Sequence, residues 1–191
     1  MTFPFDQEIL LENERALLRP LQMADVENLL QVTAGDEKLI QYSPSQIHSK
    51  ELLHQYIELA IQERARASRY PFVIYDKKQN AYAGSSSFLH IANADSRLEI
   101  GATWIGKRFQ QTGLNRHCKF LLLDFAFVQL GAERVEFRTD ERNAASRTAI
   151  EKIGGRFEGT LRSHTLMRDQ FRRNTVVYSI LRNEWKGLAL R

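Results

Sequence analysis

Helical periodicity is the first pattern in this chain of 191 residues. Over residues 114–130, Leu114, Cys118 and Leu121 recur at spacings of three and four, which places them on one face of an amphipathic helix. The same spacing of apolar positions recurs in three other stretches. We therefore predict four helices, at residues 23–32, 49–67, 114–130 and 143–153.

Polar residues and glycines mark the ends of these predicted helices. Ser49 and Asn143 are side chains that commonly accept a hydrogen bond from the first helical turn, so we expect both as N-caps. Gly131 and Gly154 suit the C-terminal ends, because glycine readily adopts the left-handed conformation found there.

Alternation of apolar and polar residues, rich in β-branched and aromatic types, predicts strands elsewhere. Gly101 lies inside one of them, in the run RLEIGATWI, and marks a bulge or a close approach of another group to the backbone. The segment 76–80 and the run MRDQF are turns, so the strands flanking each form hairpins. The predicted strands are residues 16–21, 70–75, 81–91, 97–105, 132–139, 156–166 and 172–181.

The order of elements is strand, two helices, three strands, helix, strand, helix and two strands, which is a mixed α/β arrangement. Hydrophobic residues make up 43% of the chain and charged residues 26%, enough apolar material for a sizeable core. No Pro-, Ser- or Gly-rich linker divides the sequence, so we expect one domain over residues 1–191.

Composition excludes several classes of protein. The net charge of +4 is a mild bias that favours anionic ligands without requiring nucleic acid. Cys118 is the single cysteine, and the five histidines show no metal-binding spacing, so we expect neither a disulfide nor a metal site. The N-terminal run MTFPFDQEILLENE lacks a basic, apolar leader, and no apolar run is long enough to span a membrane; we expect a cytoplasmic protein.

The segment RFQQTGLNRH, residues 108–117, connects a predicted strand to the helix at 114–130. Main-chain N–H groups at a helix N-terminus can bind phosphate, and Gly113 would allow a ligand close approach. Side chains of Gln110, Gln111 and Thr112 add donors, so a pyrophosphate ligand is one interpretation and a plain polar connection is the other.

A nucleoside-triphosphate loop is a competing interpretation of the neighbouring run GATWIGKR. Arg108 stands where that loop requires a hydroxyl to bind Mg²⁺, and the residues between the two glycines are bulky strand formers. We therefore reject it.

Gln110-x-x-Gly113, after a strand and at the start of a helix, resembles the R/Q-x-x-G-x-G/A acetyl-CoA loop of the GNAT N-acetyltransferases. Asn115 replaces the last Gly or Ala of that pattern. The run GTLRSHTLMRDQFRRNTVVYSILRNEW is similar to the C-terminal hairpin of the RimJ/RimL-like branch, which acetylates the N-termini of ribosomal proteins.

A second motif agrees with the first. Asn143-Ala-Ala-Ser146, followed by Glu151-Lys-Ile-Gly154, resembles the N-x-x-A/S…E-K-x-G helix of the same superfamily. The resemblance implies the GNAT fold, with a twisted, mostly antiparallel sheet of about six to seven strands and about four helices. It also implies acetyl-CoA as cosubstrate, an amine as acceptor, and frequent pairing as a homodimer.

The resemblance assigns roles to residues along this stretch. The strand before the loop would hold the pantetheine and polarise the thioester carbonyl through the backbone of residues 102–105, and Asn143 would bond the pantetheine amide. The residues expected to contact the cosubstrate are Trp104, Ile105, Gln110, Gln111, Thr112, Gly113, Leu114, Asn115 and Asn143.

Two residues are candidates for proton transfer. Glu99, on the face opposite Leu98 and Ile100, is either the general base or an exposed or salt-bridged strand carboxylate. Ser146 is either the acid that protonates the leaving thiolate or an ordinary first-turn residue. Many GNAT enzymes carry a tyrosine as this acid, but Ile150 stands at that position here.

The leading hypothesis is an acetyl-CoA-dependent N-acetyltransferase in which a primary amine attacks the thioester directly. The acceptor is a protein N-terminus or a small-molecule amine, and a non-catalytic acyl-CoA-binding module is the alternative from another class. Four arginines near the final hairpin form either a solvated face or a surface for an acidic acceptor or RNA, although we do not expect a nucleic-acid partner: Arg162, Arg168, Arg172 and Arg173.

Overall fold

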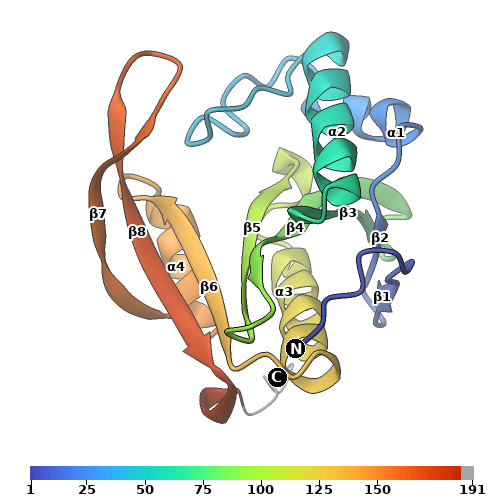
Figure 1. Ribbon diagram of the computed structural model, residues 1–191. Helices are drawn as coiled ribbons and strands as arrows, with labels where there is room; N and C mark the ends of the chain where they lie inside the picture. Colours follow the sequence, from blue (N-terminus) through green and yellow to red (C-terminus); the bar gives the residue numbers. More distant parts are fainter. Residues whose placement is uncertain (186–191) are drawn as a thin grey trace.

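The computed structural model describes residues 1–185 and is built around one sheet of eight strands, in the order β1-β2-β3-β4-β5-β6-β8-β7 (Figure 1). The strands are β1 (Leu11–Glu12), β2 (Ala16–Pro20), β3 (Arg69–Asp76), β4 (Ala81–Ala92), β5 (Arg97–Ile105), β6 (Arg134–Asp140), β7 (Arg156–Leu166) and β8 (Arg172–Leu181). The helices are α1 (Asp25–Thr33), α2 (Lys50–Ala65), α3 (Leu114–Asp124) and α4 (Ala144–Lys152), with short helical turns η1 (Lys107–Phe109), η2 (Phe125–Gln129) and η3 (Arg182–Glu184).

The helices cover both faces of the sheet, and alternate residues of β3 show how. Val73 belongs to the apolar cluster that α1 and α2 form with the sheet. Its neighbours Phe72 and Ile74 point the other way, into the larger cluster shared with α3. Ile150 of α4 lies in that larger cluster too, so α3 and α4 share one face of the sheet.

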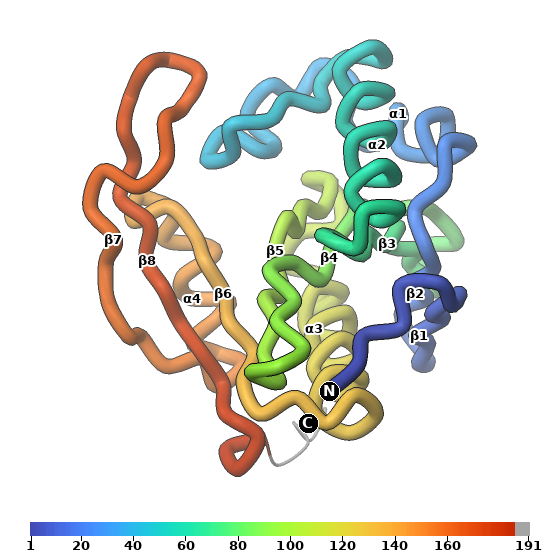
Figure 2. Tube along the Cα trace, viewed as in Figure 1, coloured from blue at the N-terminus to red at the C-terminus, as the bar shows by residue number. Residues whose placement is uncertain are grey.

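One strand pair differs from the rest. β5 and β6 are parallel, whereas every other neighbouring pair is antiparallel. Their pairing covers only three positions, from Arg97 opposite Arg134 to Glu99 opposite Glu136. Beyond Glu99 the two strands separate, and Figure 2 shows the traces moving apart toward the end near the α1–α2 segment. The sheet is therefore split in its middle.

The sequence predictions of element type and order are confirmed, with each predicted strand within two residues of its observed bounds. Ser49 accepts a hydrogen bond from the Leu52 N–H, and Asn143 accepts one from the Ser146 N–H, as expected for N-caps. The sheet has one strand more than the six to seven expected. The additional strand is β1, which has only two residues and therefore shows no alternation of apolar and polar positions.

The predicted helix at 114–130 is continuous, but it changes from α-helical to π-helical geometry along its length. α3 ends at Asp124 and continues as the π-helical turn η2, after which Gly131 adopts a left-handed conformation (φ 69°).

Candidate active site

The split between β5 and β6 coincides with a bulge in β5. The register between β4 and β5 shifts between Ser85 and Ser87, and opposite this shift Ala102 has φ 47°. Ala102 is exposed although it lies within a largely buried strand. The bulge expected near Gly101 is thus present, at the point where β5 has lost its partner on one side.

The bulge reverses which face the side chains of β5 occupy. Leu98 and Ile100 point into the cluster shared with α3, so Glu99 points to the opposite face, as predicted. Beyond the bulge, Trp104 lies in the cluster of α1 and α2, while Ile105 lies in that of α3. Glu99 and Trp104, five positions apart, therefore share one face, which strict alternation would forbid.

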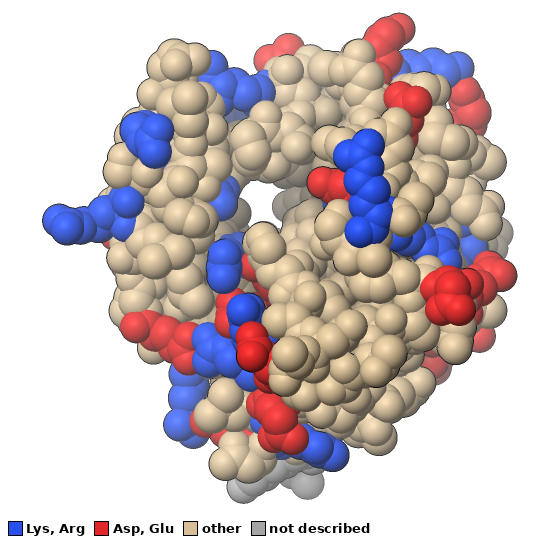
Figure 3. All heavy atoms as spheres, in the orientation of Figure 1, with Lys and Arg blue, Asp and Glu red and all other residues tan. Residues whose placement is uncertain are grey.

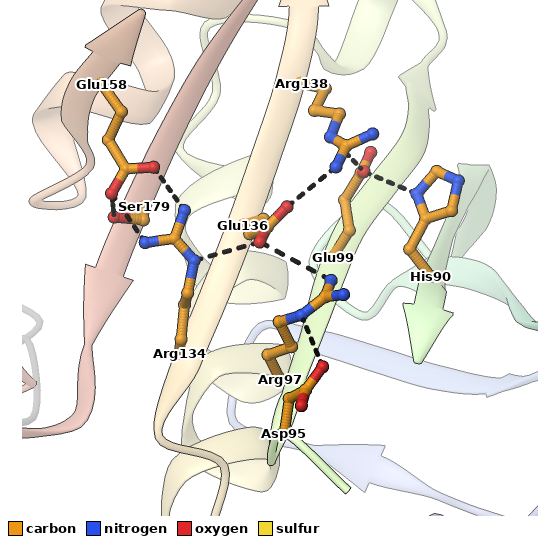
Figure 4. Close-up of polar contacts among 9 residues, drawn as sticks. All are labelled: His90, Asp95, Arg97, Glu99, Arg134, Glu136, Arg138, Glu158 and Ser179. Carbon is orange, nitrogen blue, oxygen red and sulfur yellow. Dashed lines mark hydrogen bonds and ion pairs between the residues drawn. The ribbon is translucent and has the colours of Figure 1, made fainter. Parts of the chain in front are cut away.

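Glu99 occupies the vertex of the split. Its side chain is 6% exposed, and Oε2 lies 2.9 Å from His90 Nδ1 and 3.3 Å from Arg138 Nε (Figure 4). The hydrogen bond to Glu99 raises the pKa of His90, against the opposing effect of burial. A Cβ atom at Gly101 would lie 2.7 Å from Glu99 Oε1, so glycine leaves room for the carboxylate.

Glu99 is thus a buried, salt-bridged carboxylate, as one of the two interpretations expected, and its role as the general base stays a prediction. Its partners His90 and Arg138 were not among the site residues expected from the sequence. His90 adopts φ 46° where the β4–β5 register shifts again, and this irregularity turns its ring toward Glu99. A regular strand pattern carries no signal for that geometry.

A ladder of ion pairs continues from Glu99 across the closed end of the split (Figure 4). Glu136 accepts hydrogen bonds from Arg138 and from Arg134, and Arg134 also pairs with Glu158 of β7. The Arg134 guanidinium lowers the pKa of Glu158 to about 2. These contacts tie β6 and β7 together below the point where β5 and β6 part.

In the loop before α3, the side chains of Gln110 and Thr112 form hydrogen bonds within the protein. Gln110 donates from Nε2 to the Ile105 carbonyl (2.9 Å), and the Thr112 hydroxyl donates to the Phe109 carbonyl (2.7 Å). Arg15, which sequence analysis missed, donates to the Thr112 carbonyl and hydroxyl while it pairs with the buried Asp76. These bonds fix the loop and occupy two side chains that the sequence suggested as ligand donors.

The main-chain donors of this loop remain available. The N–H groups of residues 111–115 have no hydrogen-bond acceptor within the described part of the chain. Gly113 is left-handed (φ 87°) and open to solvent, with no atom within 4 Å of the place where a Cβ would stand. Lys107 and Arg108 are exposed close by in sequence. Together these features make a cationic helix N-terminus.

The second motif opens α4 in the same way. Asn143 caps the helix through Oδ1, and Ser146 is half-buried in its first turn. Ile150 is 6% exposed and packs in the core, so the side chain at this position is structural. Asn143 is therefore confirmed as a cap, while its contact with a ligand and the role of Ser146 stay predictions.

An opening passes between the separated strands. Figure 3 shows it at the centre of the molecule, bounded by the α1–α2 segment above and by β5 and β6 at its sides. Arg173 of β8 donates to the Tyr42 carbonyl in the α1–α2 segment (2.6 Å), which joins the two flanks above the opening. Two of the four hairpin arginines have structural partners: Arg173 is half-buried and bonds Tyr42, and Arg172 donates to the carbonyl and hydroxyl of Ser163 across the hairpin. Arg162, Arg168 and Arg172 are exposed.

Other candidate residues have structural roles. Cys118 is buried, and burial raises the pKa of its thiol to about 12, which agrees with packing rather than nucleophilic chemistry. Within residues 1–185, no three His, Cys, Asp or Glu side chains gather so as to hold a metal ion. None of the helices in this part of the chain combines the length and apolar character needed to cross a bilayer.

This chain is similar to known proteins in sequence and in fold. Residues 15–156 match the family described as the acetyltransferase (GNAT) domain. The chain belongs to the GNAT acetyltransferase family. The resemblance drawn from its two motifs is thereby confirmed, and with it the assignment as an N-acetyltransferase, for which the family's cosubstrate is acetyl-CoA.

Relatives of this GNAT acetyltransferase agree. It is 22% identical over 181 residues to the "Uncharacterized N-acetyltransferase p20" of Bacillus licheniformis, covering 93% of this chain and 98% of that protein. It is 30% identical over 115 residues to the "Putative ribosomal N-acetyltransferase YdaF" of Bacillus subtilis (strain 168), covering 60% of each. A solved GCN5-related N-acetyltransferase from Brucella melitensis has the same fold, with a TM-score of 0.86 and 24% identity over 94% of this chain and 81% of that one.

Proposed function

We propose that this GNAT acetyltransferase transfers the acetyl group of acetyl-CoA to the α-amino group of a protein N-terminus. The observation that carries the proposal is the split after Glu99, where an exposed bulge and a buried carboxylate lie at the vertex of the two strands. The amine would attack the thioester carbon there, forming the C–N bond as the C–S bond breaks.

The loop at 110–115 would hold the CoA pyrophosphate. Five consecutive main-chain N–H groups at the positive end of α3 have no acceptor among residues 1–185, and such groups form the kind of site that binds phosphate oxygens. Gly113 leaves open space in which the pyrophosphate could approach the backbone. Arg15 fixes the loop through its hydrogen bond to the Thr112 carbonyl. Residues 102–105 would lie along the pantetheine, and Asn143 at the start of α4 would bond it from the other side of the split.

Glu99 would receive the proton that the attacking amine loses. An α-amino group has a pKa of about 7.7 to 8.0, so much of it is already neutral near pH 8, whereas a lysine side chain at about 10.4 is not. A carboxylate that is already engaged with His90 and Arg138 suits the less demanding acceptor. The name of the Bacillus subtilis relative points to the same acceptor class.

The loop assignment is tested by substitution of Gly113. Gly113→Glu places a carboxylate in the space proposed for the pyrophosphate, and we expect CoA affinity measured by calorimetry to fall at least tenfold. Gly131→Glu is the matched control, because Gly131 is also left-handed and open but lies beyond the far end of the same helix. Equal affinities for the two variants would refute the loop assignment.

The acceptor is tested by thiol release with acetyl-CoA. Peptides without lysine and with a free N-terminus should be acetylated, and the same peptides with a blocked N-terminus should not. Polyamines, aminoglycosides and free amino acids form the comparison panel. Turnover confined to that panel would replace a protein acceptor by a small-molecule amine, and CoA binding without turnover on any amine would indicate an acyl-CoA-binding module.

A further inference from the structure

Lys119 is a buried cation on the apolar face of α3. Its neighbours on this face, such as Leu122 and Cys118, belong to the core, and Lys119 itself is 7% exposed. Its ammonium donates a hydrogen bond to Thr103 Oγ1 (2.8 Å) and lies 5.7 Å from the centre of the Phe137 ring. Thr103 Oγ1 in turn lies 2.7 Å from Ser86 Oγ, so a short polar chain runs through the core here.

The partners of Lys119 place it in the split. Thr103 belongs to β5 and Phe137 to β6, at positions where the two strands no longer pair. Thr103 also lies within residues 102–105, the segment that the proposed function assigns to the thioester. The bulge at Ala102 turns Thr103 toward α3, so Lys119 lies on one face of the split and Glu99 on the other.

Packing alone does not explain why the Lys119 ammonium is buried. The ammonium has three donors, and its hydrogen bond to Thr103 uses one of them on a neutral hydroxyl, which is poor compensation for burying a charge. The titratable groups whose charges act on it are the thiol of Cys118 on its own helix and, from the other face of β5, the carboxylate of Glu99, while β6 contributes the Phe137 ring. Burial lowers the pKa of Lys119 to about 8, within the range useful to a proton donor near neutral pH.

The chain also lacks the usual candidate for this proton. Ile150 occupies the position where many GNAT enzymes carry a tyrosine, and it is buried in the core. Ser146 carries a hydroxyl, which is a weak acid by itself. The thiolate that leaves CoA therefore requires another donor or water.

We propose that the Lys119 ammonium protonates the sulfur that leaves CoA, an inference that rests on the proposed function. The amine nitrogen bonds to the acetyl carbon and its surplus proton passes to Glu99. The C–S bond breaks with its electron pair on sulfur, and the Nζ–H proton of Lys119 moves to that sulfur. Lys119 is left neutral and regains a proton from solvent before the next turnover, while Glu99 returns one.

The test compares three variants of the full chain by the pH dependence of acetyl transfer and by the ionisation of bound CoA. Lys119→Met keeps an unbranched side chain that is one heavy atom shorter and uncharged. Lys78→Met is the control, because Lys78 lies exposed in the β3–β4 turn. Ser146→Ala tests the rival acid. The ionisation of the CoA thiol is followed by the ultraviolet absorbance of the thiolate.

We expect Lys119→Met to reduce the transfer rate at least about 100-fold, in line with the usual contribution of a general acid. We expect the wild-type rate to fall at alkaline pH as Lys119 loses its proton, and this fall should be absent in Lys119→Met. In bound CoA, the Lys119 charge should lower the thiol pKa in wild type and in Lys78→Met, but not in Lys119→Met.

Several results would overturn the inference while leaving the proposed function intact. The first is a fall in rate at alkaline pH that persists in Lys119→Met, and the second is the loss of that fall in Ser146→Ala instead. The third is equal ionisation of the CoA thiol in wild type and Lys119→Met. A wild type that binds no CoA would instead refute the proposed function itself. Desulfo-CoA, which lacks the sulfur, should bind wild type and Lys119→Met equally, and a large loss there would show that Lys119 only shapes the site.

Discussion

At the scale of single residues, the split sheet depends on side chains that break local rules. Gly101 leaves room for a carboxylate that would collide with any Cβ, and Ala102 adopts a left-handed conformation that alanine seldom takes. Lys119 keeps a charge in the core. Such features cost stability, and enzymes retain them where the chemistry uses them.

Lys119→Met gives a prediction about stability as well as activity. The folded pKa of about 8 lies below the ordinary value of 10.5, so below pH 8 the folded state buries a charge that it disfavours. This penalty is relieved as pH rises from 8 to 10.5, because the unfolded chain then binds more protons than the folded one. We expect the variant to be more stable than wild type at pH 7, by up to about 3 kcal/mol, with the difference vanishing near pH 10.5.

Urea denaturation of both proteins at pH 7 and pH 10 measures that difference, and other titrating groups cancel in the comparison. A variant less stable than wild type at pH 7 would show that Lys119 supports the fold. Its role would then be structural, whatever its effect on the rate.

At the scale of elements, β5 and β6 share only three paired positions, so the two parts of the sheet need other connections. The ladder through Glu136, Arg134 and Glu158 supplies one at the closed end of the split. In Figure 3, acidic and basic side chains alternate below the opening. The ladder thus holds the strands together at one end while they part at the other.

Acid should weaken this connection. The pKa of Glu158 is lowered to about 2 by Arg134, so its stabilising contribution is present above about pH 4.5 and is lost as pH falls toward 2. Because the side chain is 38% exposed, we expect Glu158→Gln to cost only about 1 kcal/mol at pH 7. Its stability should also fall less steeply than that of wild type between pH 5 and pH 3.

Glu12→Gln is the control, since Glu12 pairs with Lys77 at an exposed site of the edge strands. Chemical denaturation at the two pH values measures both variants. The ladder would lose its assigned role if Glu12→Gln and Glu158→Gln changed stability equally.

At the scale of the whole molecule, sequence patterns predicted the order of elements and the two helix N-termini, because periodicity and capping are local properties. β5 was predicted with its observed bounds, and Gly101 signalled the irregularity within it. The faces beyond the bulge could not be predicted, since alternation assumes a regular strand. For that reason the hydrogen bond between Lys119 and Thr103 could not be predicted, and the sequence marked Lys119 only as a residue within a helix.

The bond between Arg173 and the Tyr42 carbonyl has a topological consequence. The bond joins β8 to the α1–α2 segment above the opening, while the pairing of β5 with β6 closes the split at its other end, so the opening has a continuous rim. We expect this rim to limit how bulky an acceptor can be where it enters between β5 and β6.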